Sequence, residues 1–163
     1  MKRIFLFIFC VLFAFSCTAC GESINMCKLT EYQNGDFCAE LKISARGKEY
    51  SAKLSKSGER FTLCPEPLAP FCFVLEEGGA AIISGEAEIN FGTGALFPLS
   101  GVYRLFTVPI AGTWKIEKAR PGGVSLYVCK SEDITLYIDA NSHLPLKMLS
   151  GDLDLDVLFF KAQ

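Results

Sequence analysis

The sequence of 163 residues carries 16 basic and 18 acidic side chains, a formal charge of −2, and 50% of its residues are hydrophobic. This length and composition are typical of one globular domain with its own apolar core, and they exclude a disordered polar chain. The mildly acidic balance argues against nucleic acid or anionic lipid headgroups as electrostatic partners.

Residues 1–19 have the composition of an export signal. Lys2 and Arg3 form a basic start, and an unbroken apolar run extends from Ile4 to Phe15. This run is shorter than the roughly 20 apolar residues that a membrane-spanning helix needs. We therefore predict a cleaved signal peptide over residues 1–19. Its removal takes Lys2 and Arg3 from the 16 basic residues, which leaves 14 against 18 acidic ones and a charge of −4.

A cysteine follows the small residues that end this segment, in the stretch Phe15-Ser16-Cys17-Thr18-Ala19-Cys20-Gly21. Thr18 and Ala19 before Cys20 resemble the bacterial lipobox, although Cys17 stands where that motif usually has Leu. The resemblance implies that Cys20 is acylated and becomes the first mature residue. The protein is then exported and lipid-anchored to the outer face of the bacterial cell membrane. Each methylene of the acyl chains that is buried in the membrane contributes ~0.8 kcal/mol to the free energy of attachment. Cys17 is a competing site, and an ordinary secretory signal cut after Ala19 is the alternative.

The chain after the signal is predicted to form a short tether followed by one domain. Residues 20–35 form the anchor and a tether, with a short helix over 22–33 that ends at Asn34-Gly35. Residues 36–163 contain no low-complexity linker or repeat, so we predict a single domain.

Hydrophobic residues recur with a period of two through most of this domain. Phe37, Ala39, Leu41 and Ile43 alternate with polar side chains, and a tight turn at Arg46-Gly47 leads into the next strand. Further strands are predicted at 50–54, 61–64, 71–75, 80–84, 87–91, 113–117, 124–129, 134–138, 145–149 and 153–160. Many short strands separated by turns indicate a mostly β (α+β) domain built as an antiparallel meander.

One internal segment breaks this rhythm. Residues 99–108 carry Val102, Leu105 and Phe106 at the i, i+3, i+4 spacing of a helix face, and Pro98 and Pro109 bound the segment. We predict a short helix that lies across the sheet.

Several short motifs of this domain resemble the LolA/LolB-like lipoprotein-carrier superfamily. They are Gly47-Lys48-Glu49-Tyr50, Pro65-Glu66-Pro67-Leu68, Leu136-Tyr137-Ile138-Asp139 and His143-Leu144-Pro145-Leu146-Lys147. The resemblance covers roughly residues 36–160. It implies a small lipoprotein with a strongly curved antiparallel sheet, an incomplete β-barrel, whose concave apolar face is partly covered by one or two short helices and can hold acyl chains.

Five of the eight cysteines lie in the mature domain, at positions 27, 38, 64, 72 and 129. Cys64 and Cys72 flank the proline-rich segment 65–70, where a disulfide would close a short loop in an exported protein. The interpretation that we favour is that these cysteines serve as small hydrophobic residues. No Cys-x-x-Cys pair remains in the domain, so neither a zinc site nor a thioredoxin-like site is indicated.

Catalytic and metal-binding residues are not indicated, and we expect no enzymatic activity and no cofactor. His143 is the only histidine and lies in a turn without a nucleophile motif beside it. Asp152, Asp154 and Asp156 have a spacing of two, which places them on one solvated strand face rather than around a cation.

Two functions remain after these exclusions. The first is a lipid-anchored carrier that holds an acyl chain or a lipoprotein on its concave face, and the second is a structural or protein-interaction lipoprotein whose apolar face is filled by its own side chains. The 14 phenylalanines suit either a packed core or a ligand pocket. The residues proposed to line the ligand face are Phe73, Leu75, Phe91, Leu105, Phe106 and Trp114.

Overall fold

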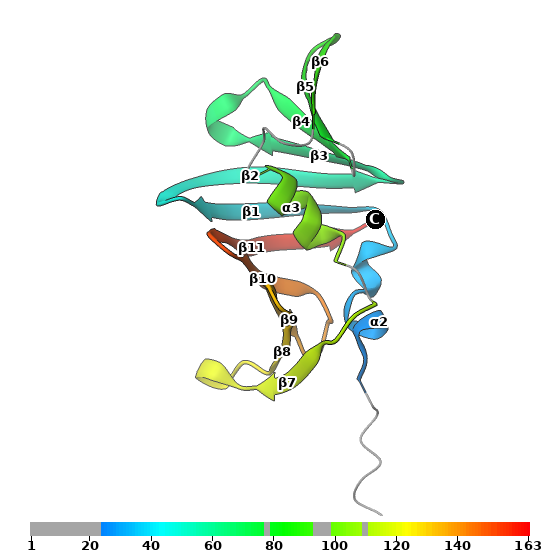
Figure 1. The fold of residues 1–163 in the computed structure, drawn as a ribbon, viewed down its shortest axis with the longest axis vertical. Coiled ribbons are helices and arrows are strands. Elements are labelled where there is room, and N and C mark those ends of the chain that lie inside the picture. The colour runs from blue at the N-terminus through cyan, green and yellow to red at the C-terminus, as the bar shows by residue number, and fades with distance from the viewer. Residues whose placement is uncertain (1–23, 77–78, 93–98, 109–110) are drawn as a thin grey trace, which may run out of the picture.

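The computed structural model describes residues 24–76, 79–92, 99–108 and 111–163, which form one curved antiparallel sheet with a helix across its concave face (Figure 1). The eleven strands pair in the order β6-β5-β4-β3-β2-β1-β11-β10-β9-β8-β7. Within the described residues the sheet has two edges, β6 and β7, so it is an incomplete barrel. The predicted fold class is therefore confirmed. The predicted signal 1–19 and Cys20 lie outside the described residues.

The strands and helices have the following bounds. The strands are β1 Phe37–Ala45, β2 Lys48–Ser57, β3 Arg60–Pro65, β4 Cys72–Glu76, β5 Gly79–Ser84, β6 Ala87–Gly92, β7 Lys115–Ala119, β8 Leu126–Lys130, β9 Ile134–Asp139, β10 Pro145–Ser150 and β11 Leu153–Ala162. The helical segments are α2 Met26–Leu29, η1 Glu31–Gln33, η2 Glu66–Leu68, α3 Leu99–Phe106 and η3 Pro121–Gly123. No helix among these residues is long and apolar enough to span a membrane.

The first and last strands lie side by side in the middle of the sheet. β1 pairs with β2 on one side and with β11 on the other. Arg46 and Gly47, with φ of 50° and 72°, form the two-residue turn between β1 and β2. Positive φ at both positions matches the twist of the flanking strands. The predicted hairpin is confirmed.

The core lies on the concave face, where every second residue of the central strands is buried. On β1 the exposed fraction of Phe37, Leu41 and Ile43 is 0%. Helix α3 covers this face, and its apolar side chains Leu99, Val102, Leu105 and Phe106 are buried. A Cβ on Gly101 would lie 2.5 Å from Cδ2 of Leu153 on β11, so the helix packs as close to the sheet as glycine permits.

The N-terminal helix is shorter than predicted. The described part of the 22–33 segment forms α2 and η1, separated at Thr30, whose φ of −111° and ψ of 14° are not helical. The Oγ1 atom of Thr30 donates a hydrogen bond to the carbonyl of Met26 at 2.7 Å, while Asn25 caps the start of α2 by accepting from the N–H of Lys28 at 3.1 Å. Two local side-chain bonds thus limit α2 to four residues.

Cys64 and Cys72 form a disulfide, so the interpretation of all five cysteines as small hydrophobic residues is wrong for this pair. The register explains the bond, because Leu63 pairs with Phe73 and the next position on each strand brings the two thiols together. For Cys129, which is fully buried, the interpretation as a small hydrophobic residue is confirmed. Burial raises the pKa of the Cys129 thiol to about 11.

Candidate functional site

An aromatic cluster joins α3 to the middle of the sheet. The ring of Tyr103 on α3 meets the ring of Phe61 on β3 edge-on, with centroids 5.3 Å apart. Phe61 contacts Phe37 on β1 at 6.1 Å, and Phe37 lies 5.6 Å from Phe106 on α3. Strand alternation directs Phe37 and Phe61 to the same face, which is why rings from two strands and a helix meet.

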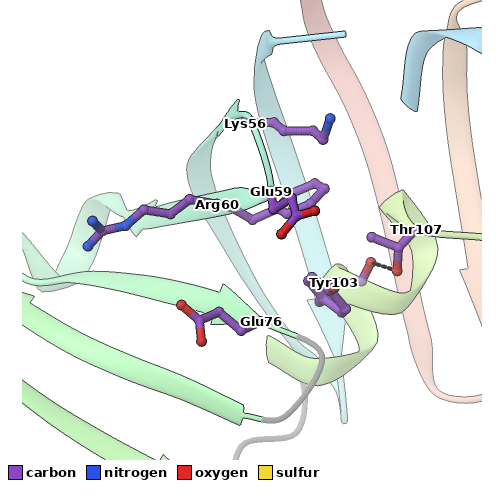
Figure 2. A pocket seen from close by; sticks show the side chains of 8 residues that line it. Lys56, Glu59, Arg60, Glu76, Tyr103 and Thr107 are labelled. Carbon is purple, nitrogen blue, oxygen red and sulfur yellow. Dashed lines mark hydrogen bonds between the residues drawn. The ribbon is translucent and has the colours of Figure 1, made fainter. Parts of the chain in front are cut away.

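A cleft of about 680 Å³ opens beside this cluster, between α3 and the β2–β3 hairpin (Figure 2). Its floor contains Phe61, which is almost fully buried, and Tyr103, which is half-buried. The hydroxyl of Thr107 donates a hydrogen bond to the Tyr103 carbonyl at 2.9 Å and closes the end of the helix. Small-molecule pockets span about 300–1,000 Å³, so this α3 cleft has the size of a ligand site. It is lined by Lys56, Gly58, Glu59, Arg60, Phe61, Glu76, Tyr103 and Thr107.

Charged side chains surround the aromatic floor of the α3 cleft. The ammonium of Lys56 lies 5.9 Å from the centre of the Phe61 ring and donates a hydrogen bond to the Gly35 carbonyl at 3.2 Å. Glu76 lies at the end of β4, and Arg60 extends away from α3 (Figure 2). The cleft therefore offers aromatic surface inside and charges of both signs at its mouth, which suits a ligand with an apolar body and a polar end.

Four of the six residues proposed for the ligand face lie together in the core. Phe73 and Leu75 on β4 are 8% and 1% exposed, and Leu105 and Phe106 on α3 are 0% exposed. They belong to one continuous cluster of buried side chains. Helix α3 thus covers this part of the face with its own side chains.

The other two proposed residues lie elsewhere on the sheet. Phe91 is on the edge strand β6, opposite Ala80 of β5. Trp114 is half-buried and lines a second cleft beside α2. The floor residues Phe61 and Tyr103 are not among the six residues predicted from the sequence to line the ligand face. Tyr103 lies next to the apolar positions of the predicted helix, but its contact with Phe61 depends on how α3 crosses the sheet.

Of the groups considered for catalysis or metal binding, His143, Asp154 and Asp156 are engaged in structural contacts, whereas Asp152 lies in the exposed turn before β11 and not on the strand face predicted for it. His143 lies in the β9–β10 turn, with its ring 6.2 Å from that of Tyr127. Asp154 and Asp156 pair with the ammonium of Lys147 at 2.8 and 3.1 Å, and these contacts raise the pKa of Lys147. Among the described residues, no group of three or more His, Cys, Asp and Glu side chains is placed to hold a metal ion.

No protein-family model matches this chain, and no curated protein matches it. The fold is similar to that of an uncharacterized conserved protein from Thermus thermophilus, with 15% identity, a TM-score of 0.52 and 85% of each chain covered. It is also similar to MucB, with 15% identity and a TM-score of 0.52 over 83% of this chain and 56% of that one. This chain thus spans about half the length of MucB. A LolA superfamily protein from Nitrosomonas europaea matches at 9% identity and a TM-score of 0.44, over 86% of this chain and 94% of that one. At these identities the likeness is one of fold: an open, curved antiparallel sheet.

Proposed function

We propose that this chain is an exported, non-enzymatic lipoprotein, anchored through Cys20, that binds a ligand with an acyl chain in the α3 cleft. The observation that carries the proposal is the cleft itself, whose floor of Phe61 and Tyr103 is continuous with the core. Apolar ligand surface that covers this floor is removed from contact with water, which contributes about 25 cal/mol per Å² to the free energy of binding. The charged mouth keeps the polar end of such a ligand in contact with solvent.

The disulfide supports the exported location. Cys64 and Cys72 are bonded within one domain, and such bonds persist mainly in oxidising compartments outside the cytosol. Ile24, the first described residue, follows Cys20 by four positions, a stretch that reaches at most ~14 Å. An acyl group on Cys20 would therefore hold the domain close to the membrane surface.

The two groups of aromatic and aliphatic residues have different places in this proposal. Tyr103, which is half-buried, is the aromatic side chain that a ligand meets first, and the almost fully buried Phe61 packs edge-on against its ring. The previously proposed residues Leu75, Leu105 and Phe106 form a fully packed layer behind that floor. A ligand reaches this layer only by displacing side chains of α3, so we propose the floor as the primary contact.

The closed packing of the core favours the second candidate function, a lipoprotein that binds another protein. Phe37 and Phe106 are 0% exposed, whereas Leu158 and Phe159 on β11 are 63% and 51% exposed. A bulge at Glu40/Leu41 in the register of β1 with β11 leaves Leu158 outside the strand pairing. These two adjacent exposed apolar side chains offer a contact surface for a partner protein.

Native mass spectrometry of protein extracted under mild conditions separates the two candidates. A ligand in the α3 cleft appears as an added mass on the protein. Tyr103→Ala should lower the affinity for this ligand roughly tenfold, since truncating a central aromatic contact costs about 1–2 kcal/mol. Phe159→Ala is the matched control, because it removes an aromatic ring from the opposite face of the sheet. A folded protein that repeatedly carries no ligand would leave the protein-interaction role as the better account.

The anchor is tested separately. The intact mass of the exported protein should equal that of residues 20–163 plus acyl chains, and Cys20→Ala should release the protein from the membrane fraction. An unmodified mass, or membrane association that survives the substitution, contradicts anchoring at Cys20.

A further inference from the structure

The two ends of the sheet carry opposite charge. The β7–β8 hairpin, residues 115–130, contains four basic residues and one acidic residue, Glu117, so its charge is +3. At the other end, residues 66–92 contain five glutamates and no basic residue. Figure 1 places β7 and β8 at one end of the longest axis and β5 and β6 at the other. We call the first the basic end, with Lys115, Lys118, Arg120 and Lys130, and the second the acidic end.

The four basic side chains are exposed: Lys115 and Lys118 lie on the edge strand β7, Arg120 follows its end, and Lys130 lies on β8. Lys115 pairs with Glu117 at 2.7 Å and lies opposite Lys130 in the register of β7 with β8. Lys118 lies 5.8 Å from the ring centre of Tyr127. All four cations are solvent-exposed, so together they present a positive surface around β7.

The first described residues of the chain lie beside the basic end. Ile24 and Met26, within the predicted tether, line one cleft of about 330 Å³ together with Ile116 of β7 and Trp114 just before that strand. Trp114 is half-buried in this cleft and is the only tryptophan of the chain. An apolar cleft with a tryptophan thus adjoins the positive surface.

We infer that the basic end binds the surface of an anionic phospholipid bilayer, with Trp114 at the boundary between headgroups and acyl chains. Lysine and arginine side chains close to an anionic leaflet are attracted to it, and tryptophan concentrates at the membrane interface. The inference rests partly on the proposed function, because acylation of Cys20 would bring this end to the membrane. The acidic end then points away, beyond the range of about 8–10 Å over which surface charge acts at physiological salt.

A different role for these lysines is that they prevent β7 from pairing with the edge strand of another molecule. Lysine on an exposed edge strand has this effect in many sheets. The complementary charge of the acidic end would even favour pairing of β6 with β7 between copies. Measurements of vesicle binding and of self-association distinguish membrane contact from these effects on strand pairing.

The test uses the exported chain with Cys20→Ala, so that no acyl group contributes to binding. We expect it to partition onto vesicles of phosphatidylcholine that contain about 40% of the anionic lipid phosphatidylglycerol. It should not partition onto vesicles of phosphatidylcholine alone. Emission from Trp114 should be quenched by brominated acyl chains only in the anionic vesicles. Added salt should weaken the binding.

Two pairs of substitutions locate the surface. Lys118→Gln with Lys130→Gln should weaken partitioning about 25-fold, since each cation near the bilayer contributes roughly a factor of five. Lys48→Gln with Lys53→Gln removes the same charge from β2, in the middle of the sheet, and should leave partitioning unchanged.

Several results would overturn the inference. They are equal affinity for both kinds of vesicle, equal loss in the two pairs of variants, and assembly of the chain into salt-sensitive oligomers in place of vesicle binding. If the Lys118/Lys130 variant does not fold, the chain that keeps both lysines still tests the inference, through the salt dependence of its vesicle binding and the quenching of its Trp114 emission. The proposal that Cys20 is acylated is tested by the intact mass of the exported protein. Its outcome is therefore independent of whether the basic end binds vesicles.

Discussion

The close approach of α3 to the sheet at Gly101 leads to a quantitative prediction. A methyl group at this position would lie 2.5 Å from Cδ2 of Leu153, whose side chain is only 1% exposed and has little room to move. Overpacking of this kind costs about 1–3 kcal/mol. Alanine in place of glycine in a helix contributes about 1 kcal/mol in the opposite direction. We therefore expect Gly101→Ala to lower the free energy of unfolding by ~1 kcal/mol.

Removal of the clashing side chain should reverse the sign of this effect. Leu153→Ala alone should cost about 2–5 kcal/mol, because it leaves a cavity in the core. In that background the methyl group of Gly101→Ala enters the cavity, the clash disappears, and the helix gain of ~1 kcal/mol remains. The two substitutions should therefore couple by about 2 kcal/mol.

Urea unfolding of the four proteins, followed by Trp114 emission, measures the coupling. Gly35→Ala is the control, since no atom lies within 4 Å of a Cβ at that position and the substitution should not couple to Leu153→Ala. If Gly101→Ala changes stability by the same amount with and without the Leu153 side chain, α3 does not pack against β11 as closely as described.

Three further predictions concern the turns and the cysteines. Oδ1 of Asp139 accepts hydrogen bonds from the N–H groups of Ser142 at 2.7 Å and Asn141 at 2.9 Å, which lower the pKa of this carboxyl below its ordinary value of 3.8. The ionised carboxyl of Asp139 therefore stabilises the fold above about pH 4, and this stabilisation is lost as the pH falls through the lowered pKa. The urea midpoints of the native chain and of Asp139→Asn should accordingly differ at pH 7 and converge near pH 2. Replacement of both Cys64 and Cys72 by Ala should lower the free energy of unfolding by about 2.5 kcal/mol in denaturant titrations, as expected for a loop of eight residues. Peptide mapping after alkylation at pH 8 should show Cys27 modified, because it is exposed, and Cys129 modified only after unfolding, because it is buried and its pKa is raised to about 11.

Strand alternation was sufficient to predict the sheet because one face of each central strand is buried. On β1 the buried residues Phe37, Leu41 and Ile43 occupy every second position, which a pattern with a period of two captures directly. The predicted strands at 113–117 and 124–129 differ from β7 and β8 by two residues at their starts. The predicted strand at 50–54 likewise starts two residues after β2 does, in the middle of the sheet, so the period of two locates strands better than it locates their ends.

The candidate site was less predictable than the fold. Hydrophobicity selects residues that leave water, so it found Leu75, Leu105 and Phe106, which the structure places in the closed core. Which aromatic side chains remain beside an opening depends on where α3 crosses the sheet. The contact between Phe61 and Tyr103 joins residues 42 positions apart in the sequence, and no local pattern relates them.

Net charge does not describe the local charge that a partner meets, because it sums over groups that lie far apart on the molecule. The chain as a whole is acidic, yet residues 115–130 carry four cations and one glutamate. A charged surface acts on groups within a Debye length of about 8–10 Å, so a bilayer beside β7 is affected by these cations and hardly by the glutamates near β6. The antiparallel order of the sheet places these two strands at opposite edges. Topology therefore converts a small net negative charge into a positive surface at one end, and a prediction of electrostatic partners requires the fold as well as the composition.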